Sequence, residues 1–152
     1  MNKKEIKLVI FDIGRVILDF DHMITCNKLA KYSKKDADYI YDFIFNSEAL
    51  KEYEKGKINS LEMFNIVSLE LGLGITYEKF REIWRDIFYL KEGIEKLIHR
   101  VKNFAAIAVL SNTDEIHFDF IREKVEIIKD FDCFYPMKQA AENQKKKYLN
   151  TR

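Results

Sequence analysis

The chain has 152 residues and a formal net charge of +1, from 26 basic and 25 acidic side chains. Hydrophobic residues make up 47% of the chain and aromatic residues 14%, which is enough to bury a core and excludes a wholly disordered protein. The apolar runs are far shorter than the roughly 20 residues of a membrane-spanning helix, and no secretory leader is recognisable, so no membrane partner is expected. Cys26 and Cys133 cannot build a disulfide framework and predict free thiols in a reducing cytoplasm.

The first predicted element is a short buried strand. Ile6–Phe11 is apolar and rich in β-branched residues. Asp12 and Gly14 follow directly, so an acid and a flexible residue lie just beyond the end of the strand.

Residues 19–89 are predicted to form an all-helical insertion. Within it, Ser60 is the expected N-cap of a helix that ends near Gly72, and Thr76 is the expected N-cap of the next helix. Apolar residues at three- and four-residue spacings predict the core face of that next helix: Phe80, Ile83, Trp84, Ile87 and Phe88.

Strands and helices alternate after the insertion. The pattern predicts a helix over residues 93–102, a buried strand over Ala105–Leu110, a helix over residues 115–124 and a short strand over Phe131–Tyr135. Alternation of this kind is typical of a parallel sheet. We therefore predict an α/β protein, with a partial Rossmann-like parallel sheet core and an inserted all-helical cap.

Polar residues follow both of the buried strands. Asp12 and Gly14 come after the first, and Ser111, Asn112 and Thr113 come after the second. Reactive groups of parallel α/β sheets gather outside the carboxyl ends of the strands, and a carboxylate beside hydroxyl and amide donors suits phosphate transfer. The alternative is that Asp12 caps a turn and Ser111 caps the following helix.

These residues resemble the motifs of the haloacid-dehalogenase-like (HAD) hydrolase superfamily. Leu8–Asp21 resembles the first motif, and Ala108–Thr113 with the later His117 resembles the second. Tyr53–Asn59 is similar to a recurring turn of the helical cap that this group inserts between the two motifs. The resemblance covers residues 5–135 and is greatest to the subgroup of small sugar-phosphate phosphatases.

The resemblance implies roles for four residues. Asp12 would be the nucleophile that forms an aspartyl-phosphate, and Asp12 with the backbone carbonyl of Gly14 would bind Mg²⁺. Ser111 and the Asn112 backbone would bind the phosphate of a small phosphorylated metabolite. The cap, residues 19–89, would select that metabolite.

The sequence departs from the superfamily in several places. Gly14 occupies the position where many of these phosphatases carry a general acid, and Arg15 is charged where a small residue or Asn is common, so it points to solvent or to a substrate phosphate. No third-motif lysine or fourth-motif acidic pair is recognisable after Tyr135. With a single carboxylate, Mg²⁺ would bind weakly. We therefore expect the 152-residue chain to have little or no activity.

The predicted domains are an incomplete core, residues 1–18 and 90–135, the cap, and a basic tail over residues 136–152. Residues 137–152 hold five basic side chains and one acid, yet show no motif for binding nucleic acid. In a shifted reading frame, AT-rich codons of this tail encode an Arg-Lys-Pro like that of the third motif. Our hypothesis is a frameshifted, truncated HAD-like chain, whose first strand would be an exposed sheet edge prone to self-association.

Two further functions stay open. The chain could be a non-catalytic protein that binds a partner through its helical cap. It could also be a haloacid dehalogenase, which uses the same nucleophile without Mg²⁺.

Overall fold

The computed structural model describes residues 5–136, and the predicted tail beyond Pro136 lies outside them. The chain divides into two compact units. An α/β unit takes residues 1–19, 89–112 and 121–152, and a helical unit takes residues 20–88 and 113–120. The chain therefore passes from one unit to the other four times.

The α/β unit is built on a parallel sheet, which confirms the predicted α/β class. Its strands are β1 (Leu8–Phe11), β4 (Ala106–Ser111) and β5 (Cys133–Pro136), in the order β1-β4-β5. Both pairings are parallel, with Phe11 aligned on Val109 and Val109 on Phe134. The first strand begins at Leu8, two residues later than the apolar run predicts.

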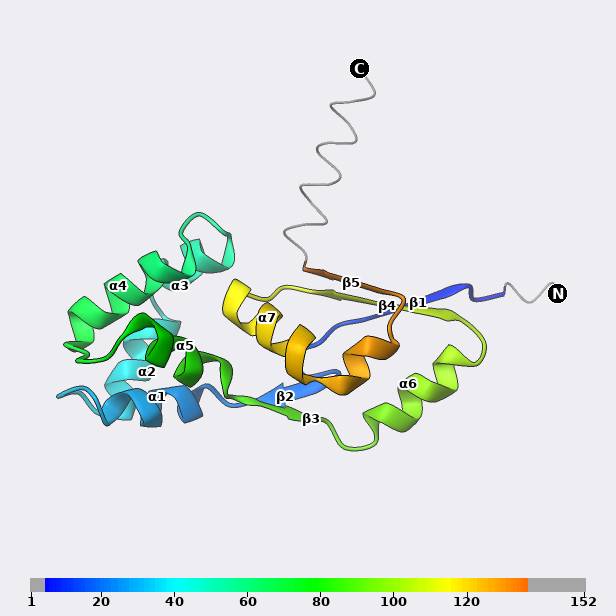
Figure 1. Cartoon of the computed structure of the whole chain (residues 1–152), viewed down its shortest axis with the longest axis horizontal. Helices are drawn as coiled ribbons and strands as arrows, with labels where there is room; N and C mark the ends of the chain where they lie inside the picture. The colour runs from blue at the N-terminus through cyan, green and yellow to red at the C-terminus, as the bar shows by residue number, and fades with distance from the viewer. Residues whose placement is uncertain (1–4, 137–152) are drawn as a thin grey trace, which may run out of the picture. The chain divides into compact units, whose positions relative to one another are not determined.

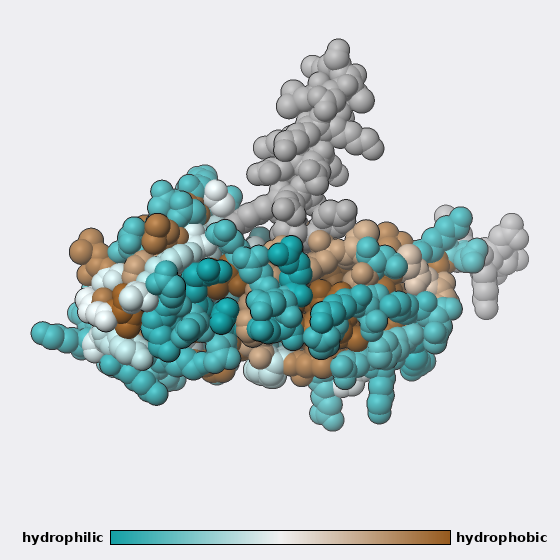
Figure 2. All heavy atoms as spheres, viewed as in Figure 1, coloured by the Kyte–Doolittle hydropathy of each residue, from teal (hydrophilic) through white to brown (hydrophobic). Residues whose placement is uncertain are grey.

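The two faces of this sheet differ in burial. Phe11, Ile107 and Val109 are buried, and the Phe11 ring packs on Phe131, with ring centroids 5.5 Å apart. Phe131 directly follows the 3₁₀ helix η1 (Glu126–Asp130), which lies with α6 (Ile94–Lys102) on one side of the sheet in Figure 1. On the other face Ile6, Leu8 and Ile10 keep 59%, 51% and 58% of their surface exposed. Figure 2 shows such hydrophobic surface, in brown, among the teal charged residues of this unit. Because β1 is the last strand of the described sheet, its outer edge is open as well.

The helical unit contains five complete helices and the start of a sixth. They are α1 (His22–Ala30), α2 (Ala37–Phe45), α3 (Glu48–Glu54), α4 (Ser60–Leu71), α5 (Tyr77–Arg85) and the first part of α7 (Glu115–Lys124). Phe80, Ile83 and Trp84 are buried in its core, as their spacing predicts. The sequence did not predict the two-stranded sheet formed by β2 (Leu18–Phe20) and β3 (Phe88–Leu90). These two strands lie where the chain passes between the units.

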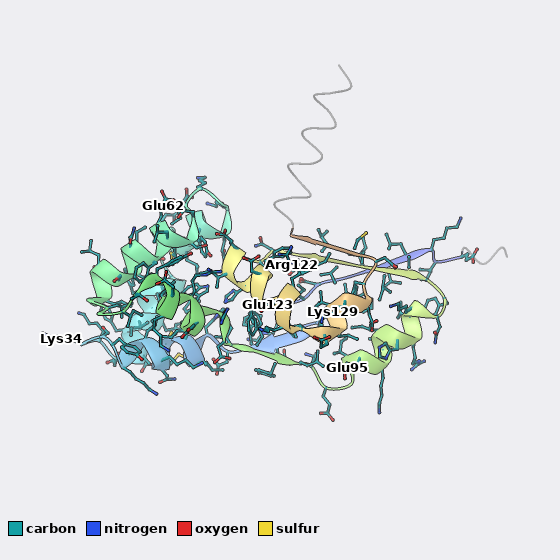
Figure 3. The ribbon with its side chains drawn as sticks, in the orientation of Figure 1. Lys34, Glu62, Glu95, Arg122, Glu123 and Lys129 are labelled. Atoms are coloured by element: carbon teal, nitrogen blue, oxygen red, sulfur yellow. The ribbon has the colours of Figure 1, made fainter. Side chains whose placement is uncertain are left out.

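The helix ends test the capping predictions individually. Thr76 caps α5 and Gly72, at φ 61°, ends α4 in the left-handed conformation, so both predictions are confirmed. The prediction for Ser60 is wrong, because Asn59 is the N-cap of α4. The Asn59 side chain accepts from the Glu62 amide at 2.9 Å, and the Glu62 carboxylate, labelled in Figure 3, accepts from the Asn59 amide at 2.7 Å. This reciprocal pair is a capping box.

None of the helices in residues 5–136 is long and apolar enough to pass through a bilayer.

Candidate active site

A tight turn holds Asp12 at the carboxyl end of β1. The Ile13 amide donates to Asp12 Oδ1 at 2.7 Å, and Asp12 is exposed. The Ile13 carbonyl then accepts from the amides of Ile17 and Leu18, both at 2.9 Å. Because Ile13, Ile17 and Leu18 are all buried, the turn is anchored on both sides.

Arg15 lies at the tip of this turn in a left-handed conformation, with φ 62°. A non-glycine residue in that region costs roughly 1–3 kcal/mol, which the surrounding contacts must offset. Arg15 Nη1 lies 3.8 Å from Asp19 Oδ1, and Lys91 Nζ donates to the Arg15 carbonyl at 3.2 Å. The Arg15 side chain remains 62% exposed, so its charge is partly neutralised by Asp19 at the surface of the turn.

Ser111 ends the neighbouring strand and Asn112 follows it. Ser111 is the last residue of β4 and is buried, whereas Asn112 is exposed. Phe11 is aligned on Val109 in the parallel pair, so Asp12 and Ser111 both follow at the same edge of the sheet. Adjacent parallel strands lie about 4.8 Å apart. The register therefore places Asp12 and Ser111 at the same edge of the sheet, with Gly14 and Asn112 next along the chain from them.

No family model matches the chain. A curated D-ribitol-5-phosphate phosphatase from Bacteroides thetaiotaomicron is 28% identical over 111 residues, which are 72% of this chain and 53% of that enzyme. The chain therefore spans about half the length of the curated relative it matches.

Solved structures show the same fold. A HAD-family enzyme from Bacteroides thetaiotaomicron, in complex with magnesium and inorganic phosphate, matches with a TM-score of 0.71 and 17% identity over 88% of this chain and 70% of that one. The chain has the HAD fold. A predicted HAD-like hydrolase from Porphyromonas gingivalis matches with a TM-score of 0.67 and 17% identity, covering 90% of this chain and 69% of that one. The resemblance seen in the sequence motifs is confirmed at the level of the fold.

The donor set of this HAD-fold chain suits Mg²⁺ only in part. Asp12 offers one carboxylate, and the Gly14 carbonyl is a second oxygen in the same turn. Residues 5–136 contain no group of three or more His, Cys, Asp or Glu side chains that could hold a metal ion. Mg²⁺ usually keeps several waters and binds through one or two carboxylates together with substrate phosphate. An ion held by Asp12 and Gly14 would therefore depend on water and phosphate for its other ligands.

A buried ion pair lies just beyond Asn112 in the sequence. Asp114 and His117 belong to the helical unit and are both buried, with His117 Nδ1 2.7 Å from Asp114 Oδ2. Burial alone would raise the pKa of Asp114, but the His117 charge outweighs it and lowers that pKa to about 2. Burial works against the charged form of His117 too, yet Asp114 raises the pKa of the imidazole above its usual 6.5.

Asp114, which the sequence analysis did not select, also takes the capping role considered there for Ser111. The amide of His117 donates to Asp114 Oδ1 at 3.0 Å, and the amide of Phe118 donates to the Asp114 carbonyl at 2.8 Å. Asp114 is thus the N-cap of α7. An Asp three residues before a His, directly after a buried strand, is the sequence signal that could have found this pair.

Proposed function

We propose that this HAD-fold chain is a phosphatase of a small phosphorylated metabolite, with Asp12 as nucleophile. The observation that carries the proposal is the exposed Asp12 carboxylate at the end of β1, next to Ser111 and Asn112 at the end of β4. The curated relative named as a ribitol-phosphate phosphatase and the neighbour solved with magnesium and inorganic phosphate support the same reaction class.

In the proposed reaction, an Asp12 carboxylate oxygen attacks phosphorus and the bond from phosphorus to the substrate oxygen breaks. The resulting aspartyl-phosphate is then hydrolysed by water, which releases inorganic phosphate and restores the carboxylate. The Ser111 hydroxyl and the Asn112 amide donate to the phosphoryl oxygens as charge develops on them. Mg²⁺, held by Asp12 and Gly14, would neutralise phosphate charge.

The leaving group should decide how well this site works. Gly14 carries no side chain that could protonate a departing alkoxide. A phenolate leaves without a proton more readily than an alkoxide does, so aryl phosphates are the better probe. We infer low turnover for the 152-residue chain, since residues 5–136 contain no group of three or more His, Cys, Asp or Glu side chains that could hold Mg²⁺.

The test is release of p-nitrophenol from p-nitrophenyl phosphate, with and without Mg²⁺. We expect slow, Mg²⁺-dependent turnover that falls to background in Asp12→Asn. Glu95→Gln, which changes an exposed carboxylate on α6, is the matched control and should keep the rate. Turnover that survives Asp12→Asn would contradict the proposal.

Two other functions give different results in the same assay series. Halide release from 2-chloropropionate without metal would indicate a dehalogenase. No turnover of either substrate would favour a binding protein, for which the surface of α4 is the supporting observation. Leu61, Ile66 and Leu69 are exposed there, and Leu69 keeps 87% of its surface.

We further propose that copies of the chain associate through β1. Its open outer edge and the exposed apolar row of Ile6, Leu8 and Ile10 support this, because such edges pair readily with another strand. The two cysteines are free, which supports a reducing cytoplasm as the location.

The frameshift hypothesis is tested by DNA sequencing across codon 135. An open shifted frame that encodes Arg-Lys-Pro supports it, and an early stop codon contradicts it.

A further inference from the structure

All the hydrogen-bonding capacity of the Asp114 carboxylate is used inside the helical unit. Oδ1 accepts from the His117 amide at 3.0 Å and faces the Tyr53 hydroxyl at 3.2 Å. Oδ2 accepts from Trp84 Nε1 at 3.2 Å and lies 2.7 Å from His117 Nδ1. A carboxylate has about four lone-pair sites, so α3, α5 and α7 together satisfy this one completely.

The surroundings of His117 require a positively charged ring. Nδ1 faces the Asp114 carboxylate, and Nε2 lies 2.9 Å from the Trp84 carbonyl, which can only accept. A neutral imidazole has one N–H and would leave one of these buried acceptors facing a lone pair. The imidazolium satisfies both.

Other polar and aromatic groups close off the pair. The Tyr53 hydroxyl also lies 3.2 Å from Ser60 Oγ, which in turn donates to Glu115. The Phe88 ring on β3 packs against the imidazole in a T-shaped arrangement, with ring centroids 4.8 Å apart. The titratable groups connected to His117 by these contacts are Asp114, Tyr53 on α3 and, through Ser60, Glu115 on α7. β3 and α5 contribute aromatic rings and a carbonyl.

The Asp114–His117 pair lies next in the sequence to Ser111 and Asn112, the residues of the proposed phosphate site. Asn112 is the last residue of its segment of the α/β unit, and Thr113 is the first residue of the helical unit. Only Thr113 separates Asn112 from the buried Asp114. The chain that carries Ser111 and Asn112 is thus fixed on one side by β4 and, two residues later, by a buried charged N-cap.

We propose that Asp114 and His117 are positioning residues, which set the backbone at Ser111 and Asn112 by fixing the first turn of α7 to the helical unit. This inference rests on the proposed function for its catalytic meaning, but the coupling itself exists without any substrate. It predicts that the charge on His117 is felt at the Ser111 and Asn112 amides.

The decisive experiment is amide and imidazole NMR of the full 152-residue chain without ligand, titrated from below to well above the usual histidine pKa of 6.5. We expect the amide chemical shifts of Ser111 and Asn112 to change with pH at the same midpoint as those of the His117 ring. At neutral pH, both amide shifts should also differ between His117→Gln and the wild type. Asp114→Asn is the second variant, should His117→Gln not fold. Glu123→Gln changes an exposed carboxylate at the far end of α7 that pairs with Lys124; it is the control and should leave these amides in place.

A kinetic measurement adds the catalytic consequence. If p-nitrophenyl phosphate is turned over, His117→Gln should lower kcat by about tenfold to a hundredfold, as expected for a misplaced binding group, and remove the alkaline limb of the rate profile. A lower melting temperature with unchanged amide chemical shifts of Ser111 and Asn112 in both variants would overturn the proposal. Asp114 and His117 would then have a structural role only. Absence of turnover with coupled amides would instead contradict the proposed function and keep the positioning role.

Discussion

The open strand β1 permits a quantitative prediction about association. Ile6, Leu8 and Ile10 keep 59%, 51% and 58% of their surface exposed. Full burial of such a side chain is worth about 1.5–3 kcal/mol, so covering the exposed half gains about 1 kcal/mol each, or roughly 6 kcal/mol for two copies. Association costs about 4–15 kcal/mol, and each hydrogen bond at the new strand pair returns about 1 kcal/mol. We therefore expect a weak dimer, with a dissociation constant in the range of about a micromolar to a millimolar.

Sedimentation velocity over a concentration series measures this association. The triple variant Ile6→Thr, Leu8→Thr, Ile10→Thr keeps residues that favour strands but removes most of the apolar gain, so it should stay monomeric where the wild type dimerises. Its urea unfolding midpoint should change little, because these side chains are half-exposed in the monomer. Leu69→Gln removes a more exposed apolar side chain elsewhere and should leave the dimer intact. A wild type that remains a monodisperse monomer at the highest concentration would refute the reasoning.

Three further predictions concern stability. Asn59→Ala breaks the capping box of α4 and should lower the free energy of unfolding by about 1 kcal/mol in urea titrations, whereas Ser60→Ala should not remove the cap. Phe80→Ala empties a buried site between the rings of Phe64 and Trp84 and should cost about 3–5 kcal/mol by the same measurement; a cost below 1 kcal/mol would mean that this core is loosely packed. The pKa of Asp114 falls from 3.8 to about 2 on folding, so its ionised form contributes about 2 kcal/mol above pH 3.8, and this is lost as the pH falls towards 2. Urea midpoints of wild type and Asp114→Asn should therefore converge on acidification, and a constant gap would contradict the assignment.

Local sequence signals predicted much of the fold because each element carries its own periodicity. The buried strand β4, predicted over Ala105–Leu110 and found over Ala106–Ser111, was readable as an apolar run followed by polar donors. Asp12 was readable for the same reason. The N-cap of α4 was misplaced by one residue because Asn59 and Ser60 are both good caps. The spacing of Asn59 to Glu62, three residues, is the capping-box pattern that favours Asn59.

Other features depend on residues far apart in the chain and leave no local trace. The buried Asp114 carboxylate accepts hydrogen bonds from Tyr53 and Trp84, which are 61 and 30 residues away in the sequence. Nothing in the residues next to Asp114 specifies these partners. The pairing of β2 with β3 likewise joins segments separated by the whole helical insertion.

The four crossings between the units limit how this protein can be recombined. A chimera that exchanged residues 20–88 alone would replace Tyr53 and Trp84 but keep Asp114 and His117, leaving a buried carboxylate and a buried imidazolium against foreign neighbours. Leaving a buried polar group without its hydrogen-bond donor costs about 1–3 kcal/mol, and more for a charged group, which is a large part of the stability of an ordinary domain. The unit that a chimera has to exchange is therefore discontinuous in sequence. Residues 20–88 and 113–120 should be moved into another protein together, so that Asp114 keeps its hydrogen-bond donors.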